Sequence, residues 1–152
     1  VSAVWRYQEI AREIGPDEMA DWLERIGYGN ADIGGGIDRF WLDGALRVSP
    51  LGQLDLLEAL VTDALDFRPE VQAAVREIFV RERGEGWVWS HKSGTTAGQR
   101  SDIRWLVGAT EWNGERRVFA FQIDRDGGAI DRAAVEDLVR SILVDDGALP
   151  EP

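Results

Sequence analysis

Three strand-like segments in the second half of the sequence constrain the fold most strongly. They cover residues 87–92, 103–109 and 117–123, and the last two are joined across Asn113-Gly114. An Asn-Gly pair between apolar runs is a strong hairpin signal, because both residues tolerate the positive φ angles of a tight turn. The segments therefore predict an antiparallel meander.

Helix signals stand on both sides of this meander. Apolar residues recur at helical spacing near residues 4–14, 19–26, 54–64 and 71–79 before it, and near 135–143 after it. Pro16, Pro50 and Pro69 suit first helical turns, and Ser49 is placed to cap the helix that begins at Pro50. Because no strand–helix alternation appears, we expect one α+β domain over residues 1–152, with an antiparallel sheet and flanking helices.

Composition excludes several classes of function. A net charge of −11 disfavours nucleic acid and anionic membranes, which bind clustered lysine and arginine. The chain has no cysteine and one histidine, His91, so neither a disulfide framework nor a cysteine-based zinc site is possible, and we expect no metal and no cofactor. No apolar run is long enough to cross a bilayer. We read His91 as a structural or rim residue.

Lys92 is the only lysine, against sixteen arginines. An ammonium group can shift its pKa and release its proton, whereas a guanidinium stays charged, so this lysine suits a site that needs proton transfer. The alternative is that one lysine stands by chance on an exposed strand.

Four short motifs change the balance between these two interpretations. They occur in a fixed order along the chain: Ser2-Ala3-Val4, Tyr28-Gly29-Asn30, Phe40-Trp41-Leu42-Asp43-Gly44 and Lys92-Ser93-Gly94. The ordered set resembles the class D serine β-lactamases and their relatives, the β-lactam sensor domains and penicillin-binding transpeptidases. A coincidental match in a small acidic domain is the remaining alternative.

The resemblance implies a β-lactamase/transpeptidase-like fold and β-lactam hydrolysis through a serine acyl-enzyme. It also exposes a gap, because the family's nucleophile lies in a Ser-x-x-Lys motif and none of the six serines here is followed by lysine three places later. We therefore expect a partial domain that lacks the amino-terminal part and is inactive as this chain. The alternative function is a penicillin-binding or β-lactam-sensing module that binds without turnover.

By the same resemblance, four residues would be catalytic. Lys92 and Ser2 would pass a proton to the leaving nitrogen, the Thr95 backbone N–H would form half of an oxyanion hole, and Trp41 would face the family's carbamylated lysine. Ser2 could equally cap a helix, and Trp41 could simply anchor a glycine-rich loop.

Substrate-binding roles fall on a further set of residues. Ser93 and Arg132 would hold the substrate carboxylate, although Arg132 could instead pair with Glu136 on its own helix, and the family position could fall one turn later, on Val135. The others would shape the cleft, and they are Gly94, Leu42, Val4 and Tyr28. A plain turn is the alternative for Tyr28-Gly29-Asn30.

The resemblance also implies partners and a location. A β-lactam or a peptidoglycan stem peptide would be the ligand, in a periplasmic or secreted protein that meets a membrane only if an upstream segment exists. The family resemblance alone implies this location, and the absence of cysteine fits it.

Overall fold

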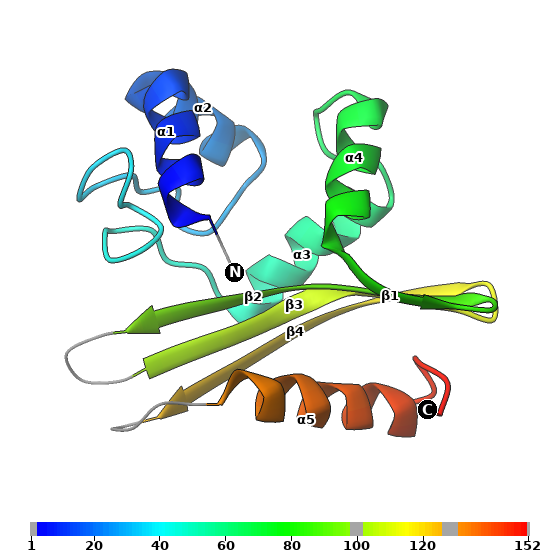
Figure 1. Ribbon diagram of the computed structural model, residues 1–152. Coiled ribbons are helices and arrows are strands. Elements are labelled where there is room, and N and C mark those ends of the chain that lie inside the picture. The colour runs from blue at the N-terminus through cyan, green and yellow to red at the C-terminus, as the bar shows by residue number, and fades with distance from the viewer. Residues whose placement is uncertain (1–2, 98–101, 126–130, 152) are drawn as a thin grey trace. The chain divides into compact units, whose positions relative to one another are not determined.

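The computed structural model describes residues 3–97, 102–125 and 131–151. They form two compact units, Val1–Leu56 and Leu57–Pro152, each of which is described here by itself. Figure 1 shows the helices and strands of both. The expectation of one domain over the whole chain stays a prediction.

The first unit holds two helices and a long loop. Helix α1 spans Val4–Ile14 and α2 spans Pro16–Arg25, with proline at its first turn and Asp17 and Glu18 near its positive end, so both predicted helices are confirmed. Helix α3, Pro50–Val61, begins in this unit and ends in the next. The Ser49 hydroxyl accepts a hydrogen bond of 3.0 Å from the Gly52 N–H, as a capping serine does.

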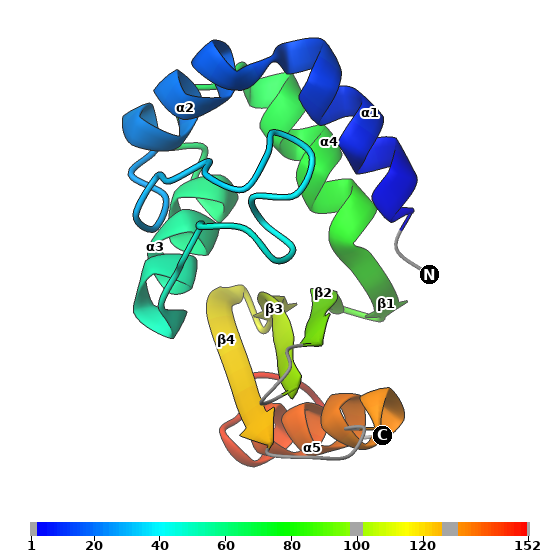
Figure 2. The same cartoon turned by 90° about the vertical axis from the view of Figure 1, so that its left-hand side faces the viewer.

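The second unit contains a four-stranded antiparallel sheet. After helix α4 (Pro69–Phe79) come β1 (Val80–Gly84), β2 (Trp87–Ala97), β3 (Asp102–Trp112) and β4 (Glu115–Arg125), and helix α5 (Arg132–Asp145) follows. The strands lie in chain order, β1-β2-β3-β4 (Figure 2). The Asn113-Gly114 hairpin is confirmed, since Trp112 pairs with Glu115 across it.

Helix α5 covers one face of this sheet, and α4 stands on the other (Figure 1). Leu106 is fully buried at the centre of the α5 face. The core around it comprises Trp89, Val135, Val139, Leu143, Ala148 and Leu149, with Phe119, Phe121 and Ile123 packed against it. The predicted final helix is therefore confirmed, with Val135, Val139 and Leu143 as its buried face, whereas Leu138 and Ile142 are 47% and 49% exposed.

Two features of the second unit differ from expectation. Strand β1 was not predicted, because its sequence, Val-Arg-Glu-Arg-Gly, is mostly charged and four of its five residues are exposed. The expected apolar face of α4 is largely open, with Val71 37% and Ile78 67% exposed. Gln72 is the buried residue of that helix, and its amide donates to the carbonyls of Leu65 and Phe67 at 3.1 and 2.8 Å. The buried Gln72 amide thus satisfies two carbonyl groups of the loop that precedes α4. The spacing of apolar residues could not indicate this role for a polar side chain.

Candidate functional site

The Lys92-Ser93-Gly94-Thr95 segment lies on a partly open edge of the sheet. Strand β3 pairs with β2 along its whole length, from Trp87 to Ala97. Strand β1 pairs with β2 only as far as Ser90. Beyond Ser90, the outer edge of β2 therefore has no strand partner among the residues that the structure describes.

Two tight turns determine which backbone groups face this edge. Gly84 pairs with Trp87 across a two-residue loop, and the residues that close such a loop are hydrogen-bonded to each other. Bonding direction alternates along a strand, so the N–H and C=O groups of every second residue after Trp87 face outward. These residues are Trp89, His91, Ser93 and Thr95, and the Asn113-Gly114 hairpin gives the same alternation through β3.

Two side-chain hydrogen bonds agree with this alternation. Arg81 Nε donates to the His91 carbonyl at 3.2 Å, and Lys92 Nζ donates to the Ser93 carbonyl. The Thr95 N–H, which the resemblance assigns to an oxyanion hole, accordingly faces the open edge. Sequence reasoning missed Arg81, because it lies at an irregular step of the unpredicted strand β1.

Side chains alternate in the same way, and this separates Lys92 from Ser93. Trp89 and His91 face α5, with ring centroids 4.5 Å apart, so Ser93 and Thr95 share the α5 face. Lys92 belongs to the opposite face with Gly94. The backbone groups of Ser93 and Thr95 therefore share the outer edge of β2. The Lys92 ammonium and the Ser93 hydroxyl, by contrast, lie on opposite faces of the sheet.

Positive charge gathers around this edge. Burial lowers the pKa of Lys92, and the charges of Arg81 and Arg132 lower it further. Arg132 begins α5 and donates from Nε to Glu136 at 2.8 Å, which is the pair given above as the alternative to a carboxylate clamp. Val135, the other position considered for a basic clamp, is a core residue only 5% exposed.

His91 is buried beside these cations. It is 3% exposed, and its Nδ1 has no hydrogen-bond partner in the described part of the chain. Burial lowers its pKa to about 4, although the nearby Glu136 carboxylate acts in the opposite direction. The imidazole is therefore neutral near pH 7 and fills space against Trp89, as the structural interpretation predicted.

The remaining candidates belong to the first unit. Tyr28 donates from its hydroxyl to Gln53 at 2.8 Å, and burial raises the pKa of Tyr28. The Trp41 ring packs edge to face against the ring of buried Phe40, with the ring centroids 4.8 Å apart, in keeping with an aromatic anchor. Leu42 is half-buried beside it, and Val4 is 37% exposed at the start of α1. Ser2 lies outside the described residues.

The glycine-rich loop of this unit is held by Asn30. Its Oδ1 accepts from the Arg47 N–H at 2.8 Å, and its Nδ2 donates to the Ala45 carbonyl at 3.0 Å. The preceding Gly29 has φ +60°, and a Cβ there would lie 2.2 Å from the Arg47 carbonyl oxygen. The Tyr28-Gly29-Asn30 motif thus fastens the two ends of the loop together.

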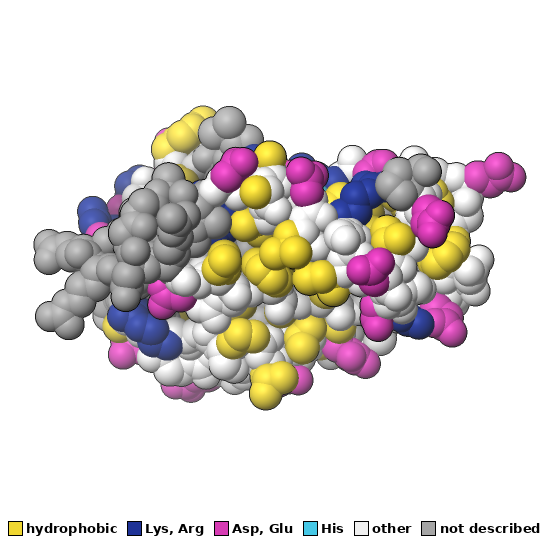
Figure 3. Space-filling model, turned by 90° about the horizontal axis from the view of Figure 1, so that it is seen from below, with side chains coloured by type: hydrophobic (Ala, Val, Ile, Leu, Met, Phe, Trp, Pro, Cys, Tyr) yellow, Lys and Arg dark blue, Asp and Glu magenta, His cyan; other side chains and the backbone are white. Residues whose placement is uncertain are grey.

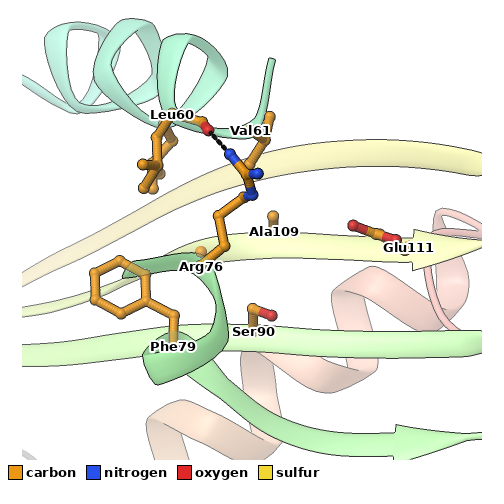
Figure 4. Close-up of a pocket in the computed structure, with 9 residues that line it drawn as sticks. Leu60, Val61, Arg76, Phe79, Ser90, Ala109 and Glu111 are labelled. Carbon is orange, nitrogen blue, oxygen red and sulfur yellow. Dashed lines mark hydrogen bonds between the residues drawn. The ribbon is translucent and has the colours of Figure 1, made fainter. Parts of the chain in front are cut away.

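A separate pocket lies on the α4 side of the sheet (Figure 4). Arg76 reaches across it and donates to the Leu60 carbonyl at 2.7 Å and to Asp63 at 2.6 Å. Its other lining residues are Leu57, Val61, Phe79, Ser90, Gly108, Ala109 and Glu111. Arg76 is hydrogen-bonded at the carboxyl end of α3, and none of the predicted site residues lines the pocket. We therefore assign the pocket a structural role.

Neither a metal site nor a membrane span emerges from the described segments. Among residues 3–97, 102–125 and 131–151, no three histidine, cysteine, aspartate or glutamate side chains are grouped to hold an ion. No helix in these ranges has the length and apolar character that crossing a bilayer requires.

Comparison with known proteins identifies related sequences. The family described as penicillin binding protein transpeptidase domain matches residues 1–143. Probable β-lactamase YbxI of Bacillus subtilis (strain 168) is 36% identical over 143 residues, which are 94% of this chain and 53% of that protein. β-Lactamase OXA-10 of Pseudomonas aeruginosa is 40% identical over 129 residues, 83% of this chain and 48% of that protein. The chain thus spans about half the length of these curated relatives.

Solved structures give the same result. The class D β-lactamase YbXI from Nostoc superposes with a TM-score of 0.88 at 36% identity, covering 96% of this chain and 62% of that one. A class D β-lactamase from Bacillus subtilis gives 0.87 at 34% identity, covering 98% and 60%. The predicted α+β, β-lactamase/transpeptidase-like fold is therefore confirmed.

Proposed function

Because this chain belongs to the penicillin-binding protein transpeptidase family and is class D β-lactamase-like, we propose that it carries the strand edge of a β-lactam-binding site. The relatives named as β-lactamases support this ligand class. The proposed contact surface is the outer edge of β2 from His91 to Thr95.

The open β2 edge is the observation that supports the proposal. A β-lactam presents an amide carbonyl and, close to it, a carboxylate. An unpaired strand edge can bind such a group as it would bind an added strand, with the Thr95 N–H donating to the carbonyl oxygen. Arg81, Lys92 and Arg132 would supply the positive potential that attracts the carboxylate.

In a complete enzyme of this family, a serine hydroxyl would attack the lactam carbonyl and break its C–N bond. The ring nitrogen would take a proton, and water would then hydrolyse the acyl-serine ester. A lysine whose pKa is lowered, as that of Lys92 is, suits the proton delivery, and Ser2 would relay the proton.

The 152-residue chain itself is proposed to bind without turnover. None of its six serines is followed by lysine three places later, and its single lysine already stands in the β2 motif. We therefore assign reversible β-lactam binding to this chain. Hydrolysis is assigned only to a protein that also contains a Ser-x-x-Lys segment.

A penicillin-binding or β-lactam-sensing role is the second candidate, and the transpeptidase description of the matching family favours it. The same edge would then accept a peptidoglycan stem peptide in extended form. Either role places the protein outside the cytoplasm, where both ligands occur, and we propose that location with it.

Calorimetric titration of the purified chain with a penicillin, beside a chromogenic-cephalosporin assay, tests the proposal. We expect saturable binding, no colour change beyond the blank, and weaker binding by Lys92→Gln. Arg117→Gln is the matched control, because Arg117 lies on β4 and bonds to Asp146 and Glu115 instead. Absence of binding, or sustained hydrolysis, would contradict it.

A further inference from the structure

Arg104 is a half-buried basic residue of β3 that lies directly opposite Thr95 of β2. Two residues further along β3, Leu106 lies opposite Ser93. Residues that face each other across an antiparallel ladder point to the same side of the sheet, and Leu106 belongs to the core under α5. The Arg104 side chain therefore shares the α5 face with the side chains of Ser93 and Thr95.

The Arg104 side chain is long enough to share a ligand with the Ser93 hydroxyl. On one face of a sheet, Cβ atoms of opposite residues lie about 5 Å apart and those of diagonal neighbours about 7–8 Å apart, which a long side chain can span. Thr95 is the opposite residue, and Ser93 is a diagonal one. Figure 3 shows apolar side chains gathered over the middle of the α5 face and charged side chains toward its ends. Arg104 thus lies where this face changes from apolar to polar.

The guanidinium of Arg104 has no internal partner. Its buried Nε–H reaches no acceptor, and the side chain forms no ion pair with any residue that the structure describes. A buried donor without an acceptor costs free energy, so such groups are rare and are explained by a function or by an acceptor that binds there. Arg104 is therefore available to an anionic ligand.

Helix α5 offers no comparable group at the two positions considered for a basic clamp. Arg132 is already paired with the Glu136 carboxylate at 2.8 Å. Val135 is apolar and only 5% exposed. The amino end of the helix is also occupied, because the Asp131 carboxylate accepts a hydrogen bond from the Ala133 N–H at 3.1 Å. A cation that contacts the ligand directly would then come from the sheet.

We infer that Arg104, together with the Ser93 hydroxyl, binds the carboxylate of the ligand, so that the carboxylate clamp comes from β3 and not from α5. The inference rests on the proposed function and deepens it, because it assigns the specificity for an anionic group to one residue. A planar guanidinium can bind both oxygens of a carboxylate, whereas an ammonium such as that of Lys92 acts as a point charge. The site would therefore distinguish a penicillin from its neutral ester.

Calorimetric titration with benzylpenicillin and with its methyl ester tests this assignment. The ester keeps the lactam carbonyl that the Thr95 N–H would bind, but it lacks the negative charge. Wild type should bind the acid at least about tenfold more tightly than the ester. Arg104→Gln should weaken binding of the acid by a similar factor and leave binding of the ester unchanged, which also shows that the variant is folded.

Two further variants separate the geometry of the side chain from its charge. Arg104→Lys keeps the charge but loses the planar fork, so it should recover only part of the preference for the acid. Arg117→Gln is the matched control, because Arg117 lies on the same face at the other end of the sheet, opposite Thr110, and donates to the Asp146 carbonyl. It should keep the full preference.

The results that would overturn the inference differ from those that would contradict the proposed function. An unchanged preference for the acid in Arg104→Gln, or equal binding of acid and ester by wild type, would overturn the inference and leave the proposed function in place. Loss of the preference in Arg117→Gln would assign it to the overall charge and would also overturn the inference. Wild type that binds neither compound would contradict the proposed function, and the inference with it.

Discussion

His91 lies directly opposite Gly108 across the β2–β3 ladder, and a Cβ at position 108 would lie 2.8 Å from the His91 Cα. The same atom would lie 2.0 Å from the Ser90 carbonyl oxygen. Both neighbours belong to the backbone of β2, which is paired with β3 before and after this position. The absence of a side chain at Gly108 thus sets how closely β2 and β3 approach beneath the buried imidazole.

Gly108→Ala should consequently destabilise the second unit by about 2 kcal/mol, the usual range for forcing a methyl group into a packed site. Urea unfolding monitored by tryptophan fluorescence measures this loss. Gly94→Ala on the neighbouring strand is the matched control, because its Cβ would meet only the Trp105 Cβ, at 3.8 Å. Equal stability of the two variants would show that the strands can separate at Gly108 without cost.

Stability should fall in acid because of His91. Burial holds its pKa at about 4, below the ordinary value of 6.5, so the folded state favours the neutral ring. The contribution is fully present above about pH 6.5 and is lost as pH falls toward 4, since the unfolded chain takes up the proton first. A difference of this size corresponds to about 3 kcal/mol.

His91→Gln isolates that contribution from the titration of the carboxylates. The free energy of unfolding should depend less steeply on pH between 6.5 and 4 in the variant than in wild type. Parallel pH profiles for the two proteins would mean that the ring is protonated equally in the folded and unfolded chains.

Arg81→Gln should raise the pKa of Lys92. Burial is the main cause of the lowered value and would remain, but one of the two repelling charges would be removed. NMR titration of the side-chain ¹³Cε resonance reports this group without ambiguity, because the chain contains one lysine. Arg117→Gln is the control and should leave the titration unchanged. A Lys92 pKa that is the same in both variants would exclude Arg81 from the site.

Asn30→Ala should destabilise the glycine-rich loop by about 1–2 kcal/mol, because it leaves the Arg47 N–H and the Ala45 carbonyl without their side-chain partner. Asn30→Asp keeps the acceptor oxygen and should lose less. Chemical denaturation of the three proteins gives the order. A loss from Asp as large as that from Ala would assign the effect to the Nδ2 donor alone.

Local sequence signals predicted much of the fold. The prolines at positions 16, 50 and 69 and the Asn113-Gly114 turn act within a few residues, so the elements beside them are confirmed. Strand β1 escaped prediction because an edge strand made of charged residues has no apolar alternation. Strand β1 is stabilised by its pairing with β2, and the local sequence cannot indicate that pairing.

The sequence predicted which residues form the candidate site, but not how their side chains and backbone groups are arranged in space. Lys92 and Ser93 adjoin in sequence, yet pleating sends their side chains to opposite faces, and only the pairing of β2 shows which edge stays open. Arg81 reaches the site through tertiary structure, ten residues before the carbonyl that it binds. The proposed catalytic roles of Ser2 and Trp41 stay predictions.

The most direct test of the proposed β-lactam site is backbone amide NMR of the ¹⁵N-labelled chain during titration with a penicillin. We predict that the Ser93 and Thr95 amides shift progressively to saturation, while the Val118 and Ala120 amides on β4 stay in place. Shifts confined to β4, or none at saturating penicillin, would contradict the assignment of the β2 edge as the binding site.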